Sequence, residues 1–576
     1  MNTLVIVLIA AVVLVCAYAG YGRWLAKTWG VDPNAKTPAV RLEDGKDYVP
    51  TNGWTVFAHQ FSSIAGAGPV TGAIQAAAFG WLPVLLWVLI GGVFFGAVTD
   101  FGALYASVKN DGKSMGLLIE KYIGKTGRKL FLLFCWLFCG IVIAAFADMV
   151  AGTFNAFDAE GAPVEAAFTN GAAGMVSIMF MVFAVVFGFI QKKFSFSGWR
   201  EAVIGIVFIV LSFAVGMNCP LVFGKAAWSY ITFVYIFFAA VLPMWMLKQP
   251  RDYMTTFMFG AMIAGAVIGL LVAHPTMNLP VFTGFNNAKL GTMFPILFVT
   301  VACGAVSGFH SLVSSGTSSK TVENEKDMLK VGYGAMVLES LLAVLALCVA
   351  GAAAAADGTP ATGTPFQIFS RGVAGFFEMF GVPVSIATVF MTMCVSALAL
   401  TSLDAVARIG RMSFQELFSV DDMEHAEGWR KLCCNVYFST FITLVFGFIL
   451  TQIGYANIWP LFGSANQLLS ALVLATLCVF LKVTGRNNKM LFPPLVIMLC
   501  VTFTALVQRL IAMVKAISAA ASTAIPAGET TWGAVFIANG LQLILAVLLI
   551  VLGLNIVFHS VKSYTTCDAP EAKANV

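Results

Sequence analysis

The chain has 576 residues, of which 59% are hydrophobic and 11% charged, with a mean hydropathy of +0.89 and a net charge of +5. Soluble globular proteins carry about 25% charged residues, so this chain has too few charges to cover a water-facing surface. The composition excludes a water-soluble enzyme and predicts an all-helical, polytopic membrane protein. The small net charge does not indicate a nucleic-acid partner. Most of the 12 cysteines lie in apolar runs and none forms a CxxC pair, so we expect no disulfide framework and no metal site.

Fifteen apolar runs are long enough to cross a bilayer, the first near residues 2–20 and the last near residues 531–558. Arg23 and Lys27 follow the first run and no basic residue precedes it. This charge order is the reverse of that in a cleavable signal peptide, so we expect a retained helix. With these spans, all but five of the 33 Lys and Arg residues fall on one side of the membrane. The positive-inside rule then places the N-terminus outside and the C-terminus in the cytoplasm.

Two of the spans are predicted to be broken. The second contains small residues, hydroxyls and a proline over residues 62–72, and the ninth contains a similar cluster over residues 303–320. Gly costs about 1 kcal/mol and Pro about 3 kcal/mol inside a helix, so these clusters do not suit a continuous helix. Irregular backbone at membrane depth must be buried in protein or line a wet cavity. The alternative is that the small residues only permit close helix packing.

The two broken spans are expected to run in opposite directions, because the second leads outward and the ninth leads inward. An inverted repeat requires this relation of its first members. The spans therefore predict a leucine-transporter-like core of 5+5 helices, with five peripheral helices. The corresponding divisions are an N-terminal peripheral helix and cytoplasmic linker (residues 1–54), a first inverted repeat (55–217), two inserted helices (218–291), a second inverted repeat (292–481), and two C-terminal peripheral helices with a short tail (482–576).

We expect the substrate to bind at the two breaks. Freed N–H groups and half-helix N-termini suit an anion such as a carboxylate or a peptide C-terminus, whereas freed carbonyls suit a cation. His310 lies in the second cluster and His59 just before the first, and each is either a structural residue or a group that binds substrate or relays protons. The residues expected to bind substrate are Ser62, Ser63, Ala65, Gly66, Ala67, Gly68, Gly304, Ser307, Gly308 and His310.

Asp100, Asp148 and Glu339 are acidic residues inside apolar spans. An unpaired carboxylate in lipid costs several kcal/mol, so each is expected to have a partner in the bundle or to carry a proton. We predict that at least one of the three is required for coupled uptake, with His59 as a further proton-relay candidate. Asp100 lies near the inner end of its span, where a structural pairing with Lys109 or Lys113 is the alternative.

Several motifs occur in order along residues 55–481. They are His59-Gln60-Phe61 with residues 62–72, Asp100-Phe101, residues 109–116, residues 303–320, residues 333–336, Leu403-Asp404-Ala405 with Arg408 and Arg411, and residues 458–463 followed by Asn466-Gln467. These motifs resemble the carbon starvation protein A (CstA) family. The resemblance implies a secondary transporter of the bacterial inner membrane, in the amino acid–polyamine–organocation superfamily. Family members are linked to peptide uptake during carbon starvation and to proton-coupled pyruvate uptake.

This chain departs from the family pattern in two places. The outer connection after residue 356 is short, and Ala73 stands where a proline is expected. The resemblance also bears on coupling, because a Thr-Ser pair often holds sodium in this superfamily and Thr401 and Ser402 match it. Hydroxyls near a helix end commonly bond to carbonyls of their own helix instead. The expected partners are a peptide or small carboxylate, a proton or sodium ion and the lipid bilayer, with no cofactor and no nucleic acid.

The leading hypothesis is a secondary active transporter that imports peptides, driven by protons. A pyruvate or small-carboxylate proton symporter is the first alternative, and a nutrient sensor with a transporter fold is the second; flux as opposed to binding distinguishes the sensor. A channel is disfavoured because no repeated filter is present. The sequence has neither HExxH nor GxxxxGK[ST], which disfavours an intramembrane enzyme and an ATP-driven pump.

Overall fold

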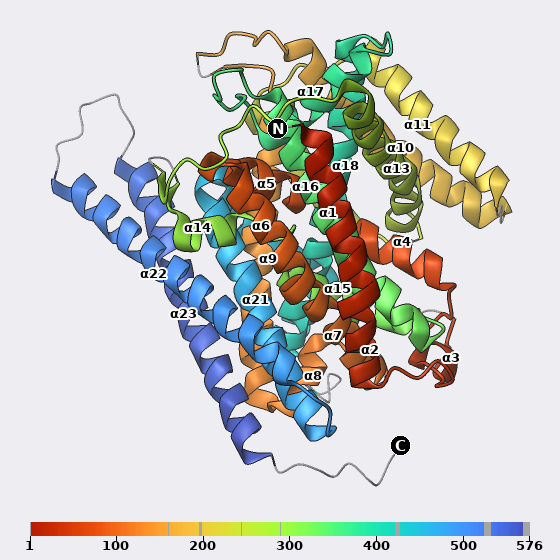
Figure 1. Ribbon diagram of the computed structural model, residues 1–576, viewed down its shortest axis with the longest axis vertical. Helices are drawn as coiled ribbons and strands as arrows, with labels where there is room; N and C mark the ends of the chain where they lie inside the picture. The colour runs from red at the N-terminus through yellow and green to blue at the C-terminus, as the bar shows by residue number, and fades with distance from the viewer. Residues whose placement is uncertain are drawn as a thin grey trace.

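The computed structural model describes residues 2–45, 47–158, 160–194, 198–243, 245–287, 290–420, 427–522 and 532–567. These residues form an all-helical bundle with one short antiparallel pair of strands (Figure 1). The first helices are α1 (Thr3–Ala17), α2 (Arg23–Trp29), α3 (Pro38–Arg41), α4 (Gly53–Ile64), α5 (Gly68–Ala76), α6 (Trp81–Gly91), α7 (Ala97–Val108), α8 (Met115–Tyr122) and α9 (Lys125–Phe154). The middle elements are α10 (Ala167–Phe194), α11 (Trp199–Asn218), α12 (Lys225–Val241), α13 (Lys248–Ala273), β1 (Asn286–Asn287), β2 (Gly291–Thr292), α14 (Met293–Thr300), α15 (Gly308–Gly316), α16 (Ala335–Ala353) and α17 (Pro365–Glu378). The last helices are α18 (Val384–Phe418), α19 (Gly428–Cys434), α20 (Val436–Thr451), α21 (Tyr455–Val483), α22 (Phe492–Ser522) and α23 (Trp532–Thr566).

Short turns of other helix types join several of these elements. Three are π-helical and lie between α1 and α2, between α6 and α7, and before α16: η1 (Tyr18–Gly22), η3 (Gly92–Gly96) and η6 (Leu329–Gly334). The others are 3₁₀ turns: η2 (Ala77–Phe79), η4 (Ser318–Lys320), η5 (Glu325–Asp327) and η7 (Lys489–Leu491). Single π-helical turns inside longer helices are common at functional sites.

Eleven helical segments of the described chain are long and apolar enough to cross a membrane, or 12 if the bent pair α19–α20 forms one span. The bend between α19 and α20 is 69°. The apolar runs of the sequence that do not correspond to one of the 11 fall on that pair, on the shorter helix α12, and on two pairs of short helices, α4–α5 and α14–α15. The structure thus has fewer long membrane helices than the sequence has apolar runs, because some runs are bent, short or broken.

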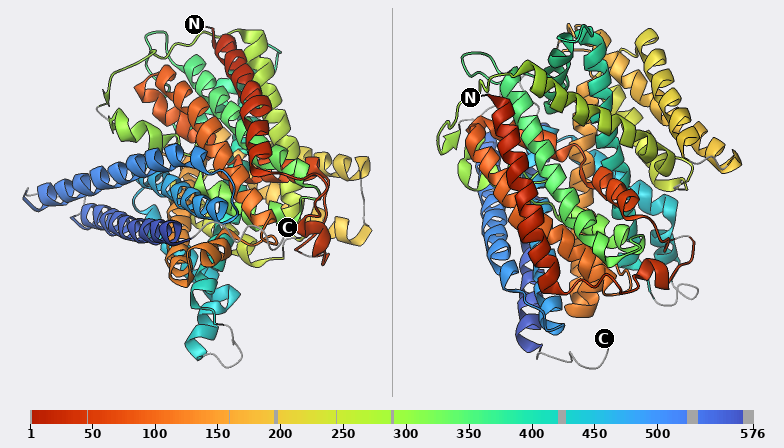
Figure 2. Two further views of the ribbon diagram at one scale, coloured as in Figure 1. Left: turned by 60° about the horizontal axis from the view of Figure 1, so that its bottom comes forward. Right: turned by 45° about the vertical axis from the view of Figure 1, so that its right-hand side comes forward.

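Helices α9 and α21 lie at the centre of the bundle. The apolar stretch of α21 is fully buried and that of α9 is 83% buried. By contrast, α22 and α23 lie side by side along one flank and extend away from the bundle in the left view of Figure 2. Helix α1 begins at the top of Figure 1 and α23 ends at the bottom, so the two ends of the described helical bundle are on opposite sides.

The two breaks touch each other in the centre of the bundle. A Cβ atom on Gly68 would clash with Cys303, one on Gly72 would lie 2.6 Å from the Thr300 carbonyl oxygen, and one on Gly304 would lie 3.6 Å from the Cα of Pro69. Residues later in the first segment therefore contact residues earlier in the second. The chain runs in opposite directions through the two touching segments, and only residues without a side chain allow this contact.

Candidate functional site

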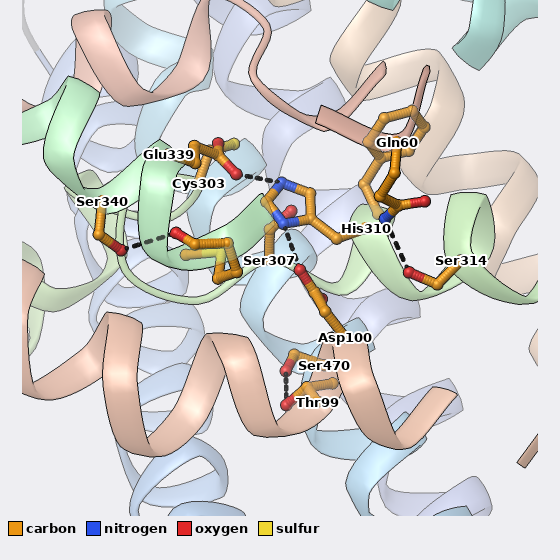
Figure 3. Close-up of polar contacts among 12 residues, drawn as sticks. Gln60, Thr99, Asp100, Cys303, Ser307, His310, Ser314, Glu339, Ser340 and Ser470 are labelled. Carbon is orange, nitrogen blue, oxygen red and sulfur yellow. Dashed lines mark hydrogen bonds and ion pairs between the residues drawn. The ribbon is translucent and has the colours of Figure 1, made fainter. Parts of the chain in front are cut away.

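Three ionisable side chains meet beside the second break (Figure 3). Nδ1 of His310 hydrogen-bonds to Oδ2 of Asp100 at 3.0 Å, and Nε2 of His310 lies 3.4 Å from Oε2 of Glu339. All three side chains are fully buried. We call His310, Asp100 and Glu339 the buried triad. Sequence reasoning marked each of these residues separately, and the structure brings them together.

Local structure explains how the triad is assembled. His310 lies in the first turn of α15, directly after the break. Asp100 and Glu339 lie near the starts of α7 and α16, each shortly after a π-helical turn, η3 or η6. A π-helical turn inserts an extra residue and so changes the direction in which the following side chains point. The two turns thus help to aim both carboxylates at the same imidazole.

The triad lacks hydrogen bonds that its atoms could make. Within the described part of the chain, Oδ1 of Asp100 and both carboxylate oxygens of Glu339 have no hydrogen-bond partner. A buried charged carboxylate without hydrogen bonds costs several kcal/mol. The imidazole supplies at most one positive charge for two carboxylates. The arrangement therefore suits a group that holds and exchanges a proton.

Asn466 on α21 caps the helix that carries His310. Its Oδ1 accepts hydrogen bonds from the backbone N–H of Phe309 at 3.1 Å and from the hydroxyl of Ser307 at 3.2 Å. Its Nδ2 lies 3.0 Å from the Ser307 hydroxyl and 3.5 Å from Sγ of Cys303. Asn466 therefore uses the N–H of Phe309, which directly follows the residues expected to bind an anion at the second break. The Asn466-Gln467 pair was noted in the sequence only as part of the family motif.

The first break uses some of its own donors as well. The N–H groups of Ala65 and Gly66 donate to the carbonyls of Phe61 and Ile64, at 2.8 and 2.7 Å. Ala67 is the N-cap of α5 and Gly68 its first residue, at the end where a helix leaves N–H groups free. At the first break, the N–H groups left for an anion are therefore those at this end of α5.

The hydroxyls at the first break differ in their roles. Ser62 donates to the His59 carbonyl at 3.1 Å, whereas Ser63 makes no hydrogen bond with another described residue. Both serines are buried. Gln60, one turn earlier, donates to Ser314 at 2.8 Å and accepts from Ser318 at 2.5 Å. This side chain ties α4 to the far end of the second broken span.

Helix α18 presents Thr401 and Ser402 near the first break. The hydroxyl of Thr401 donates to the carbonyl of Ala397 in its own helix at 2.9 Å. The hydroxyl of Ser402 lies against Gly66, where a Cβ atom would clash with it. Of the two hydroxyls expected at a sodium site, only that of Ser402 faces the break.

The remaining expected coupling residues lie away from the triad. Asp148 pairs with Nζ of Lys225 at 2.8 Å and accepts the backbone N–H of Tyr455 at 2.8 Å, so its charge is compensated. His59 is half-buried on α4, within electrostatic reach of Lys248 on α13. Within the described part of the chain, neither side chain forms a hydrogen bond or an ion pair with His310, Asp100 or Glu339.

A second buried ionic cluster was not predicted. Arg251 on α13 pairs with Asp404 on α18 and with its neighbour Asp252, and Tyr235 on α12 donates to Asp404 at 2.8 Å. The Arg251 and Asp404 side chains are each 1% exposed. In the sequence Arg251 resembles a basic residue of an inner loop, so the local pattern did not predict that it is buried. Asp404 and Arg408 lie four residues apart on α18, but the ion pair of Asp404 is with Arg251.

Two further arginines bind the end of α12. Arg408 donates to the carbonyls of Ala239 and Leu242, and Arg411 donates to that of Ala240 at 3.2 Å. The last carbonyls of a helix have no partner within the helix and carry partial negative charge, which cations stabilise. These contacts and the Arg251–Asp404 pair fasten α12 and α13 to α18.

Comparison with known proteins identifies relatives over most of the chain. The family model described as "Carbon starvation protein CstA" matches residues 2–362 and 351–505. The peptide transporter CstA of Escherichia coli K12 is 31% identical, covering 88% of this chain and 80% of its own length. The peptide transporter CstA of Bacillus subtilis 168 is 30% identical, covering 85% and 87%.

A second kind of relative covers less of the chain. The pyruvate/proton symporter BtsT of Escherichia coli K12 is 36% identical over 364 residues, which is 61% of this chain and 49% of the relative. Among solved structures, a manganese transporter of Eremococcus coleocola in complex with an aromatic bis-isothiourea substituted compound is similar with a TM-score of 0.45 and 12% identity. That alignment covers 91% of this chain and 99% of the other, but the similarity is too low to carry an argument about mechanism.

Proposed function

Because this chain belongs to the carbon starvation protein CstA family, we propose that it imports peptides across the bacterial inner membrane, coupled to protons. The relatives are transporters, and the chain is a multi-pass protein of the inner membrane and not an enzyme. Peptide as substrate is supported by the peptide transporters that align with 85% and 88% of this chain. The pyruvate/proton symporter aligns with only 61%.

We propose a topology of 15 spans with the N-terminus outside and the C-terminus in the cytoplasm. In this proposal α4–α5 opens a first repeat over residues 55–217 and α14–α15 opens an inverted second repeat over residues 292–481, in a leucine-transporter-like core. Opposite chain directions at the touching breaks support the proposal. The N-terminal division (1–54), the inserted helices (218–291) and the C-terminal division (482–576) are peripheral. Within the last division, residues 523–531 and 568–576 lie outside the described residues.

The observation that carries proton coupling is the buried triad. His310 is within 3.4 Å of carboxylates from two other helices, and all three groups are fully buried. With two carboxylates and one imidazole, the cluster avoids an uncompensated charge only when it holds a proton beyond the one shared between Asp100 and His310. Gain or loss of that proton changes the electrostatic energy at the start of α15. We propose that this step favours one orientation of the second broken span over the other.

The substrate is proposed to bind where the two breaks meet. The proposed cradle consists of the residues expected from the sequence, Ser62, Ser63, Ala65, Gly66, Ala67, Gly68, Gly304, Ser307 and Gly308. Its anion-binding part is the N-terminal end of α5. Sodium coupling through Ser402 is the alternative, and Thr401 supports it less because its hydroxyl is bonded within its own helix.

The proposal is tested with purified protein in liposomes. Uptake of a labelled dipeptide and of labelled pyruvate is measured under an imposed proton gradient and, separately, under a sodium gradient. We expect accumulation of the dipeptide under the proton gradient and its collapse when a protonophore is added. Accumulation of pyruvate instead would identify the chain as a small-carboxylate symporter. Binding without accumulation of either compound would favour a sensor and contradict the proposed transport.

A further inference from the structure

A cavity lies between the two breaks. Its walls come from both breaks and from α9, α18 and α21. Helix α9 contributes Phe138 and Phe146, α15 contributes Phe309, and α21 contributes Phe462. We call this space, defined by its four phenylalanines, the phenylalanine cavity.

Helical spacing places these side chains in one wall. Phe138 and Phe146 are eight residues apart on α9, with Val142 between them, so all three occupy one face. The ring of Phe462 lies 6.3 Å from that of Phe138 and 5.6 Å from that of Phe146, measured between centroids. Phe462 therefore sits at the centre of the aromatic wall, and its contacts with both rings fix its orientation.

No residue that lines the phenylalanine cavity carries a formal charge. Its polar side chains are those of Ser402, Asn466 and Cys303, and Asn466 is committed to Ser307 and Phe309. A charged side chain moved into this space would lose its hydration without gaining an ion partner. An apolar side chain would instead exchange water for ring contacts.

One part of the cavity wall offers polar groups. Gly66 and Gly68 of the first break line the cavity next to the N-terminal end of α5, and the Ser402 hydroxyl lies against Gly66. The hydroxyl of Ser402 makes no hydrogen bond within the described part of the chain and is available to a ligand. A peptide can place its backbone at this wall and a side chain against the phenylalanines.

From this arrangement we infer that the phenylalanine cavity binds a side chain of the peptide and selects peptides whose side chains are uncharged and apolar, with Phe462 and Phe309 as specificity-determining residues. The inference rests on the proposed peptide import. In the described state the cavity is barely larger than a water molecule. A dipeptide therefore enters only when the walls move apart, and Phe309 moves with the first turn of α15.

The test measures binding separately from flux. Tritiated Ala-Leu is bound to the purified full-length chain in nanodiscs and displaced by unlabelled Ala-Phe, Ala-Glu or Ala-Lys. We expect Ala-Phe to displace the label at a concentration at least tenfold lower than either charged dipeptide. Equal displacement by all three dipeptides, or no binding of Ala-Leu, would overturn the inference.

Two variants address the role of the cavity wall. Phe462→Ala is expected to weaken Ala-Leu binding at least tenfold and to reduce the preference for Ala-Phe over Ala-Glu. Phe131→Ala is the matched control, because Phe131 is a buried phenylalanine of α9 that does not line the cavity. Val142→Lys places an ammonium group in the wall and is expected to improve displacement by Ala-Glu relative to Ala-Phe. An unchanged order of competitors in both cavity variants would contradict the inference.

Uptake of the same dipeptides into liposomes separates this inference from the proposed function. Selective binding without proton-driven uptake would support the cavity's selectivity and contradict the transport proposal. Uptake without selectivity between Ala-Phe, Ala-Glu and Ala-Lys would support transport and overturn the inference.

Discussion

Phe309 and His310 are consecutive residues in the first turn of α15, yet their side chains serve different sites. Phe309 lines the phenylalanine cavity, whereas His310 contacts Asp100 and Glu339 in the buried triad. A helical turn is stiff, so a displacement of one residue moves the other. The proposed substrate site and the proposed proton site are thereby linked through one turn of backbone, which Asn466 holds by its bond to the Phe309 N–H.

Replacing Glu339 by Gln is expected to reduce proton-driven peptide accumulation at least tenfold. The amide cannot take up or release a proton, so the gradient no longer drives the cycle. Exchange of labelled for unlabelled peptide across the liposome membrane is expected to persist, because exchange needs no net proton movement. Both quantities are measured in the same liposomes.

The matched control for Glu339→Gln is Glu378→Gln, at the exposed end of α17. The control is expected to accumulate peptide as the wild type does. Full proton-driven accumulation by Glu339→Gln, His310→Gln and Asp100→Asn would show that the triad is not the coupling site.

Asn466→Ala removes the cap of α15. The Phe309 N–H and the Ser307 hydroxyl lose their partner, and loss of such a cap costs about 1 kcal/mol. We expect a lower unfolding temperature in detergent and a higher KM for peptide uptake. Asn555→Ala is the control, because the Asn555 amide bonds only to a carbonyl of its own exposed helix face. A wild-type KM in Asn466→Ala would contradict a role of this cap in holding the substrate site.

Asp404→Leu is expected to destabilise the protein strongly. It leaves Arg251 buried without its main counter-charge, and breaking a buried ion pair from one side costs about 3–5 kcal/mol. The double variant Arg251→Met/Asp404→Leu is expected to recover part of the loss, because it removes both charges. Thermal unfolding of the three proteins in detergent measures the effect, with exposed Arg200→Gln as control. Equal unfolding temperatures for Asp404→Leu and wild type would show that the pair contributes little.

Gly463→Ala is expected to disturb the packing of α21 on α14. A Cβ atom at this position would clash with the carbonyl oxygen of Val299, which is backbone and cannot rotate away. Overpacking of this kind costs about 1–3 kcal/mol. Gly260→Ala is the control, because nothing lies within 4 Å of the added atom. Size-exclusion chromatography and thermal unfolding compare the two variants, and a wild-type profile for Gly463→Ala would contradict the packing described here.

Much of the fold was predictable because composition and local pattern determine it. Low charge and long apolar runs predicted a helical membrane protein, and the clusters of small and hydroxyl-bearing residues predicted both breaks close to where α4 and α14 end. Single ionisable residues in apolar runs predicted His310, Asp100 and Glu339 as important. Their meeting was not predictable, because Asp100 and His310 are 210 residues apart and no local rule relates them.

Two features had no signal in the sequence. Arg251 stands at the start of an apolar run, where basic residues usually face the cytoplasm, and only packing against Asp404 buries it. The sequence did not predict the phenylalanine cavity either, for a different reason. The chain has 50 phenylalanines, and the same residue type faces lipid, core and cavity alike. Which ones line the cavity depends on how the helices pack.

The glycine contacts between the two breaks have a mechanical consequence. Gly68 lies against the side chain of Cys303, and Gly72 lies directly against the backbone carbonyl of Thr300, where no side chain is present to absorb a displacement. Because these contacts are tight, tilting one broken helix displaces the other. In the proposed transport cycle, this contact makes the two broken spans move together, which hinders opening to both sides of the membrane at once and with it a leak of protons.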